Sequence, residues 1–292
     1  MDERADRSPE SALSPESALR LPPPFVVPRR IPGAGPYLRG LYRTPGAAWP
    51  GDHVDADGEV PFPFGVPAVQ QLDALAFDAP VTLLAGDNGM GKSTVIELAA
   101  QAMAFADEGG ELVRSGELPP KPRPVLDELV RPALSATAPA NGYFLRAESF
   151  YNVAAFVDRG QDEDAFKHAP DLSLYGGVAL HEQSHGQSFL ALAANRFGPK
   201  GLFILDEPEA ALSLSGRLAL LAIVTRAANA GAQFIIATHS PVLLAIPGAT
   251  IYELSDDGVE RCMWEALDVV RTTRAFLDAP ERFIDAALGD PD

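Results

Sequence analysis

Cysteine is nearly absent from this chain, since Cys262 is the single one in 292 residues. One cysteine excludes an internal disulfide framework and any cysteine-rich zinc site. No stretch approaches the roughly 18 consecutive apolar residues that a membrane-spanning helix needs. The charged opening residues also lack the apolar segment of a secretory signal. We therefore expect a soluble, cytoplasmic protein with no direct membrane insertion.

Basic residues are scarce as well, with 23 Lys and Arg against 40 Asp and Glu, a formal net charge of −17. A protein that mainly grips DNA needs a basic surface facing the phosphates, so this balance argues against that class and leaves only a local nucleic-acid contact open. Residues 17–51 contain five arginines and no acid. That stretch is either a chance run or a docking surface for a phosphate-bearing or acidic partner.

Hydrophobic residues make up 47% of the chain, and 27 prolines and 25 glycines predict many loops around a sizeable core. Residues 1–24 repeat the hexapeptide SPESAL in tandem and then read LPPP, which predicts a disordered tail. We expect a single domain over 25–292. Within it, 25–77 suits short strands and turns, and about 107–180 suits a partly helical insertion.

Strand-like and helix-like patterns alternate along the rest of the chain. Apolar runs predict buried strands, and apolar residues three and four apart predict helices. Alternation of the two favours an α/β fold with a largely parallel sheet. The expected strands are 81–86, 143–147, 201–207 and 232–240, and the expected helices are 93–106, 187–195, 212–230 and 266–288.

The segment GDNGMGKS, residues 86–93, matches G-x-x-x-x-G-K-[ST] between an expected strand and an expected helix. Its glycines let backbone N–H groups face phosphate oxygens at a helix N-terminus. The ammonium of Lys92 suits the β- and γ-phosphates, and the hydroxyl of Ser93 suits Mg²⁺. The candidate nucleotide-binding residues are Gly86, Asp87, Asn88, Gly89, Met90, Gly91, Lys92, Ser93 and Thr94.

Two further expected strands end in polar residues. LFILDE ends in Asp206 and Glu207. The carboxylate of Asp206 is suited to a position linked to Mg²⁺, and that of Glu207 is suited to act as the base that deprotonates the attacking water. IIATHS places His239 at the next strand end, where a neutral imidazole can hydrogen-bond the γ-phosphate. The candidate catalytic residues are Lys92, Glu207 and His239.

A fourth segment, HEQSHGQS at 181–188, directly precedes an expected helix. Ser184, Gly186 and Gln187 there form a candidate anion-binding corner. Alone, this segment is a weak signal, and a polar helix cap is its ordinary explanation. Its position 22 residues before Asp206 (206 − 184) gives it more weight.

Together these motifs resemble the ABC-type ATPases, in which a Walker A motif, S-x-G-Q, an LDEP Walker B motif and a strand-end histidine follow in this order. The segments RAESF, LHEQSHG, LDEPEAALS and ATHSP are similar to the motifs of the soluble bacterial predicted ATPases of the AAA/ABC-like family. The resemblance covers roughly 60–255. It implies a P-loop NTPase fold, namely an ABC-type ATPase head with a mostly parallel central sheet, an antiparallel β subdomain and a helical insertion.

The resemblance further implies a composite site, in which two heads sandwich two ATP molecules and a homodimer forms on ATP binding. Ser184 would contact the γ-phosphate across the interface, with Glu207 as the base and His239 as the γ-phosphate switch. Ser93 and Asp206 would hold Mg²⁺. Glu148 is a candidate metal-site residue in place of the Q-loop glutamine, and is equally well explained by an ion pair with Arg146 or another residue.

Some family features have no clear counterpart here. Ser213 stands where the D-loop usually ends in aspartate. Phe64, Phe62 and Tyr42 compete as the aromatic that stacks on adenine, although core packing is the more common role for any single one of them.

The expected function is ATP binding and hydrolysis that powers or gates an unknown protein partner, for example in DNA maintenance or phage defence. Two alternatives stay open. One is the nucleotide-binding subunit of a membrane transporter. The other is a nucleotide-gated binding module with little turnover.

Overall fold

The computed structural model describes residues 35–45, 60, 63, 65–106, 109–112, 130–146 and 185–289. The expected tail at 1–24 lies outside the described residues. The strands are β1 (Leu38–Arg43), β2 (Ala74–Ala76), β3 (Val81–Gly86), β4 (Gly110–Glu111), β5 (Val130–Leu134), β6 (Asn141–Arg146), β7 (Gly201–Asp206), β8 (Gln233–Ala237), β9 (Thr250–Ser255) and β10 (Gly258–Cys262). The helices are α1 (Pro67–Gln70), α2 (Lys92–Ala102), α5 (His185–Arg196), α6 (Leu214–Asn229), α7 (Asp268–Asp278) and α8 (Pro280–Leu288), with 3₁₀ turns η5 (Leu243–Ala245) and η6 (Trp264–Ala266).

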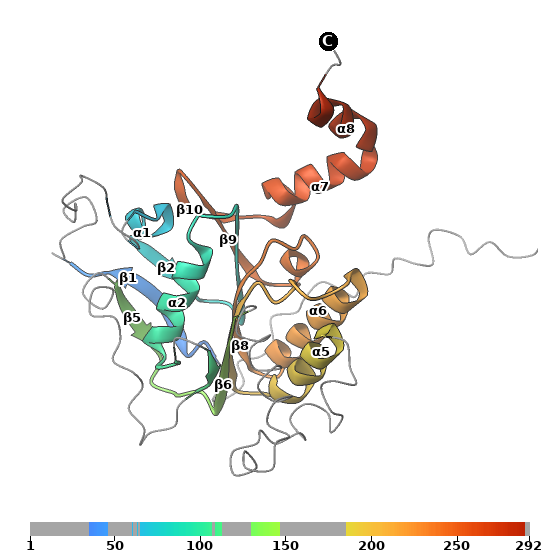
Figure 1. Cartoon of the computed structure of the whole chain (residues 1–292). Coiled ribbons are helices and arrows are strands. Elements are labelled where there is room, and N and C mark those ends of the chain that lie inside the picture. The colour runs from blue at the N-terminus through green and yellow to red at the C-terminus, as the bar shows by residue number, and fades with distance from the viewer. Residues whose placement is uncertain are drawn as a thin grey trace, which may run out of the picture.

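A seven-stranded sheet in the order β10-β9-β3-β8-β7-β6-β4 runs through the centre of the molecule (Figure 1). The inner strands β9, β3, β8, β7 and β6 pair in parallel with their neighbours, and β10 and β4 pair antiparallel at the two edges. Parallel neighbours need crossover connections, and α6 makes the one from β7 to β8. The predicted α/β fold with a mostly parallel sheet is confirmed.

A second, three-stranded sheet has the order β2-β1-β5, and both of its pairs are antiparallel. This is the predicted antiparallel β subdomain. Its strand β5 lies within the segment 107–180 that we expected to be a helical insertion. The described residues of that segment form β4, β5 and β6, and the rest of it lies outside the described residues.

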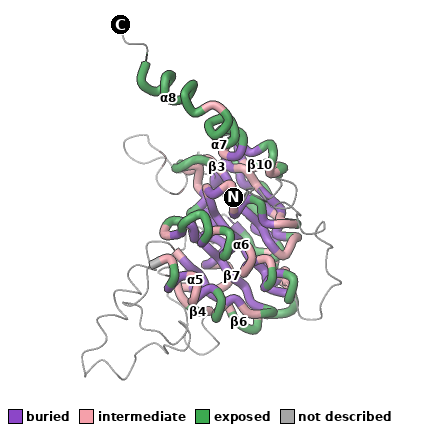
Figure 2. Tube along the Cα trace, turned by 90° about the vertical axis from the view of Figure 1, so that its right-hand side faces the viewer, coloured by how far each residue is buried: buried purple, intermediate pink, exposed green. Residues whose placement is uncertain are grey.

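Side chains alternate between the two faces of the central sheet, as the period of a strand requires. Leu83 and Phe203 face a core that includes residues of α5 and α6. Leu84 and Ile204 face a second core that includes α2 and the antiparallel sheet. Figure 2 shows the resulting buried interior, with the exposed helices α7 and α8 beyond it.

Helix ends depart from the expected ones for local reasons. Helix α2 ends at Ala102 rather than near 106, because Ala104 takes a left-handed φ of 61°. The expected helical stretch 266–288 is two helices, since Ala279 is non-helical and Pro280 begins α8. Proline lacks the N–H that would continue the first helix. Among the described residues, no helix combines the length and apolarity required to cross a membrane.

The fully buried side chain of Gln233 joins the two sheets. Its Oε1 accepts hydrogen bonds from the backbone N–H groups of Tyr37 (2.7 Å) and Leu38 (3.1 Å). Its Nε2 donates to the carbonyl of Leu38 at 2.7 Å. This one amide therefore satisfies three buried backbone groups where β1 meets β8.

We predict that Gln233→Leu lowers the free energy of unfolding by about 2–4 kcal/mol, because three buried backbone groups lose their partner while side-chain volume is kept. Denaturant unfolding followed by circular dichroism measures this change. A loss below about 1 kcal/mol would show that the sheets are joined by apolar packing alone.

Candidate functional site

The parallel strands β3, β8 and β7 end together, so their carboxyl ends form one edge of the central sheet, which runs across the strands. Leu84 of β3 is paired with Ala237 of β8, and Ala237 is paired with Asp206 of β7. The loop after β3, the end of β7 and the residues after β8 therefore emerge side by side. This register brings together the Walker A segment, the paired acids and His239, which are far apart in sequence.

The loop at 86–91 curls because its glycines adopt backbone angles that other residues rarely take. The φ angles are 131° at Gly86, 84° at Gly89 and 93° at Gly91. A Cβ on Gly91 would lie 2.3 Å from Cγ1 of Val66, so a side chain there would clash. At Gly89 no atom lies within 4 Å of such a Cβ. The loop is thus closed on the protein side and open above Gly89.

Lys92 lies at the first position of α2, and its side chain is buried at the base of the loop. Its Nζ donates to the carbonyls of Gly86 (2.9 Å) and Asp87 (2.8 Å). Burial lowers the pKa of this ammonium, while the nearby carboxylates of Glu207 and Asp206 act to raise it. The ammonium is thereby fixed inside the loop, next to the acids that end β7.

The remaining residues of the segment surround this position. Asp87 and Asn88 are exposed at the tip of the loop, Met90 packs partly against the core, and Thr94 is buried in α2. Ser93 is exposed on the first turn, with its hydroxyl directed to β7.

The hydroxyl of Ser93 donates a hydrogen bond of 3.2 Å to Oδ1 of Asp206. A hydroxyl and a carboxylate oxygen side by side are the hard donors that Mg²⁺ prefers. No group of three or more His, Cys, Asp or Glu within the described ranges could hold a metal by itself. Mg²⁺ typically takes one or two protein ligands plus water and substrate phosphates, and Ser93 and Asp206 are two such ligands.

Asp206 is 8% exposed. Burial raises the pKa of its carboxyl to about 6, with a smaller raising effect from Glu207 and an opposing one from the Ser93 hydrogen bond. A buried carboxylate without a bound cation is therefore costly to ionise in this position.

We predict that Asp206→Asn stabilises the nucleotide-free chain by about 1–3 kcal/mol at pH 8, with the gain shrinking toward pH 5. The folded pKa of about 6 lies above the ordinary 3.8, so the wild type loses stability as pH rises between these values. Denaturant unfolding of both proteins from pH 5 to 8 measures the difference. A gain that does not change with pH would contradict the account.

Glu207 and His239 lie against each other at the same edge. Oε1 of Glu207 is 3.1 Å from Nε2 of His239, and both side chains are partly exposed. Glu207 has a φ of 48°, a strained value for a residue with a side chain. Its backbone N–H donates to the carbonyl of Ala237 at 2.9 Å, which fixes the strained residue to β8.

Sequence reasoning missed Glu209, which is 7% exposed and holds the loop that carries His239. Its Oε1 accepts from Oγ1 of Thr238 (2.5 Å) and from the backbone N–H groups of His239 (2.7 Å) and Ser240 (3.0 Å). Its Oε2 is buried and has no hydrogen-bond partner among the residues that the structure describes. The sequence does contain a signal for this residue, because in the segment DEPE an additional acid follows Glu207 by two residues.

We predict that Glu209→Ala lowers the free energy of unfolding by about 2–4 kcal/mol, because it removes the acceptor of the Thr238 hydroxyl and the His239 N–H and leaves the Ser240 N–H only Oγ1 of Thr238. Glu209→Gln should cost less, since its amide oxygen can still accept those bonds. Chemical unfolding ranks the variants, and the amide NMR signals of His239 and Ser240 report the loop. Equal losses in both variants would show that the acceptor oxygen does not hold the loop.

The candidate signature residues lie elsewhere. Gly186 and Gln187 begin α5 and line a cavity of about 570 Å³, together with Ser213, Ser215 and other residues at the start of α6. Among the described residues that line this cavity, none belongs to the loop at 86–93. Ser213, in place of the usual aspartate, caps α6 by accepting from the N–H of Gly216 at 3.2 Å. Ser184 and Glu148 lie outside the described residues.

Arg146 at the end of β6 pairs with Glu97 of α2 at 2.8 Å, so Glu97 is one ion-pair partner of this arginine. Of the aromatic candidates, Tyr42 lies on β1 and is 40% exposed, whereas Phe62 and Phe64 lie outside the described residues.

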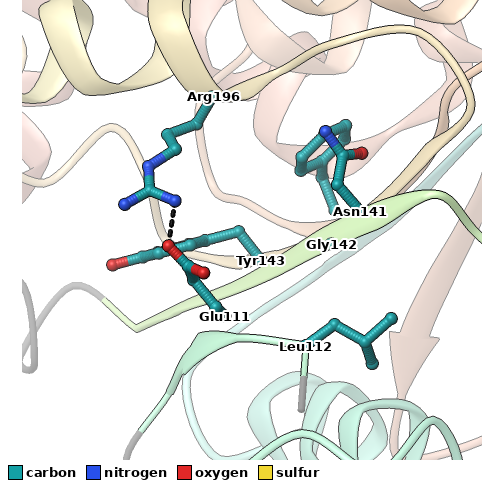
Figure 3. Close-up of a pocket in the computed structure, with 7 residues that line it drawn as sticks. Glu111, Leu112, Asn141, Gly142, Tyr143 and Arg196 are labelled. Carbon is teal, nitrogen blue, oxygen red and sulfur yellow. Dashed lines mark hydrogen bonds and ion pairs between the residues drawn. The ribbon is translucent and has the colours of Figure 1, made fainter. Parts of the chain in front are cut away.

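A second cavity, of about 120 Å³, lies at the start of β6, away from the carboxyl ends of the strands that carry the candidate site (Figure 3). Arg196 pairs with Glu111 across it, and the guanidinium lies 5.9 Å from the centre of the Tyr143 ring. Its lining shares no residue with the loop at 86–93 or with the acids that end β7.

The fold and the site define a P-loop nucleotide-binding class: a glycine-rich loop between β3 and α2, a hydroxyl and a carboxylate placed for Mg²⁺, and a carboxylate and imidazole beside them. Comparison with known proteins agrees. The family described as "AAA domain, putative AbiEii toxin, Type IV TA system" matches residues 145–245.

The curated relatives that match this chain are named as ATP-binding proteins. The chain is 29% identical over 182 residues to the cytochrome c biogenesis ATP-binding export protein CcmA of Nitrobacter winogradskyi, covering 60% of this chain and 85% of the relative. It is 28% identical over 184 residues to a putative ABC transporter ATP-binding protein of Streptomyces avermitilis, covering 62% of this chain and 32% of the relative.

A third relative is the ribose import ATP-binding protein RbsA of Yersinia pestis, 26% identical over 210 residues, with 65% of this chain and 38% of the relative covered. The chain thus spans about a third of the length of two of these relatives. A solved ATP-binding cassette of an ABC transporter, in its ADP conformation, is similar with a TM-score of 0.43 and 15% identity over 87% of this chain and 99% of that one. The predicted class, an ATPase of the ABC/AAA type, is supported by the family match and the curated relatives.

Proposed function

We propose that this chain binds ATP with Mg²⁺ and hydrolyses it. The observation that carries the proposal is the hydrogen bond between Ser93 and Asp206, with Glu207 and His239 at the same sheet edge. These groups belong to three separate segments, which the parallel register of β3, β8 and β7 brings together.

Each residue has one proposed task. Lys92 and the N–H groups of the loop bind the phosphates. Ser93 and Asp206 would hold Mg²⁺, which neutralises phosphate charge when bound. Glu207 takes a proton from the attacking water. His239 hydrogen-bonds the γ-phosphate and, through its contact with Glu207, senses whether the base is engaged.

We further propose that two copies associate head to tail on ATP binding and that Ser184, Gly186 and Gln187 of one copy complete the site of the other. The cavity beside Gly186 lacks residues of the 86–93 loop, which supports a role for this corner on a nucleotide held by a second subunit. Closure of the two heads would then gate a partner protein.

A complementation experiment tests the composite site. We expect Lys92→Ala and Ser184→Arg each to lose ATP hydrolysis by at least about a hundredfold. Mixing the two variants should restore part of the wild-type rate, because a mixed pair keeps one intact P-loop facing one intact signature. Phosphate release measures the rate, and the Lys92→Ala, Ser184→Arg double variant mixed with wild type is the control. No recovery in the first mixture would overturn the composite site.

The names of the relatives favour a second candidate, in which the chain serves as the ATP-binding subunit of a membrane transporter. The match to a family described as a putative toxin of a type IV TA system favours instead a role in such a system. Co-purification of the tagged chain from its own host separates them, since a membrane permease would appear only in the first case.

A further inference from the structure

Helix α2 presents two polar side chains to the carboxyl ends of β6 and β7. Ser93 and Glu97 are four residues apart, so they lie on the same face of this helix. Ser93 hydrogen-bonds Asp206 at the end of β7. Glu97 pairs with Arg146 at the end of β6, where Oε1 of the acid lies 2.8 Å from a guanidinium nitrogen. One helix face therefore contacts both a proposed Mg²⁺ ligand and an arginine.

Arg146 lies directly beside Asp206. The two residues are partners in the parallel register of β6 and β7, so their backbones are about 4.8 Å apart. Their side chains leave the same face of the sheet, since both contact α2. Burial is the main cause that raises the pKa of the Asp206 carboxyl, and the positive charge of Arg146 acts against it. The guanidinium is thus close enough to act on Asp206 and on a ligand bound there.

Acids outnumber cations at these strand ends. Among the described residues, the cations are Lys92 and Arg146, and the acids whose charges act on Lys92 or Asp206 are Asp87, Glu97, Asp206, Glu207 and Glu209. Lys92 lies in the loop after β3, whereas Arg146 follows β6, on the other side of Asp206 from that loop. A bound triphosphate adds negative charge to this excess of acid, and an arginine supplied by the same chain can offset it together with Mg²⁺.

We propose that Arg146 is a further residue of the ATP site and that its guanidinium binds the γ-phosphate, an inference that rests on the proposed function. In the strand order β3-β8-β7-β6, the loop that binds the inner phosphates follows β3, and Asp206 and Arg146 lie progressively farther from it. The terminal phosphate is therefore the one nearest Arg146. The arginine side chain is 27% exposed, and a planar guanidinium has enough donors to bind Glu97 and a phosphate together.

Calorimetric binding of ATP and of ADP, each with Mg²⁺, tests this assignment. Arg146→Gln should weaken ATP binding at least about tenfold and ADP binding less than about threefold, because only ATP carries the γ-phosphate. Arg196→Gln is the matched control, since Arg196 also pairs with a glutamate but lies at the end of α5, away from the site. It should leave both affinities unchanged. Equal losses for ATP and ADP in Arg146→Gln, or no loss for either, would overturn the assignment.

A second variant separates phosphate binding from support of the fold. Glu97→Gln breaks the same ion pair as Arg146→Gln but keeps the guanidinium and removes a nearby negative charge. We therefore expect Glu97→Gln to bind ATP at least as tightly as the wild type. A loss of ATP affinity as large as that of Arg146→Gln would assign Arg146 to the ion pair alone and overturn the proposal.

The same titrations distinguish this proposal from the proposed function. A wild type that binds no ATP would contradict both. A wild type that binds and hydrolyses ATP, together with an Arg146→Gln variant of equal ATP affinity, would overturn the role of Arg146 and leave the proposed function standing.

Discussion

The site depends on one constraint, the parallel register of β3, β8 and β7. Because Leu84, Ala237 and Asp206 lie at the same level of the sheet, the three segments that follow these strands open onto one edge. A shift of one residue in any strand would turn its side chains to the opposite face. The hydrogen bond between Ser93 and Asp206 and the contact between Glu207 and His239 exist only in this register.

Charge burial is the second feature that shapes this edge. Lys92, Asp206 and Glu209 are each less than a tenth exposed, although buried charges are costly unless they are paired or hydrogen-bonded. Lys92 offsets the cost through two carbonyls, and Glu209 does so through three donors on one of its oxygens. Within the described part of the chain, the carboxyl of Asp206 accepts one side-chain hydrogen bond, from Ser93, so it is the group whose buried charge a bound cation would stabilise most.

The sequence patterns predicted the central elements well, because strong local signals determine them. The run VTLLAG, the glycines of the loop and the acids after LFIL each follow from chemistry within a few residues. Gln233 and Glu209 could not be found in this way. Their roles depend on backbone groups 195 and 30 residues away, which only the folded chain brings close. The helix break before Pro280 could have been predicted from the sequence, but the exposure of helices α7 and α8 on either side of it could not.

The central claim is that the residues at the carboxyl ends of β3, β7 and β8 hydrolyse ATP, with Glu207 as the base. Its most direct test compares the wild type with Glu207→Gln in two assays, binding of ATP with Mg²⁺ by calorimetry and steady-state release of phosphate. The account predicts that the variant binds ATP as tightly as the wild type and releases phosphate at least about a hundredfold more slowly. Equal rates in the two proteins would contradict it, and so would a wild type that binds no ATP.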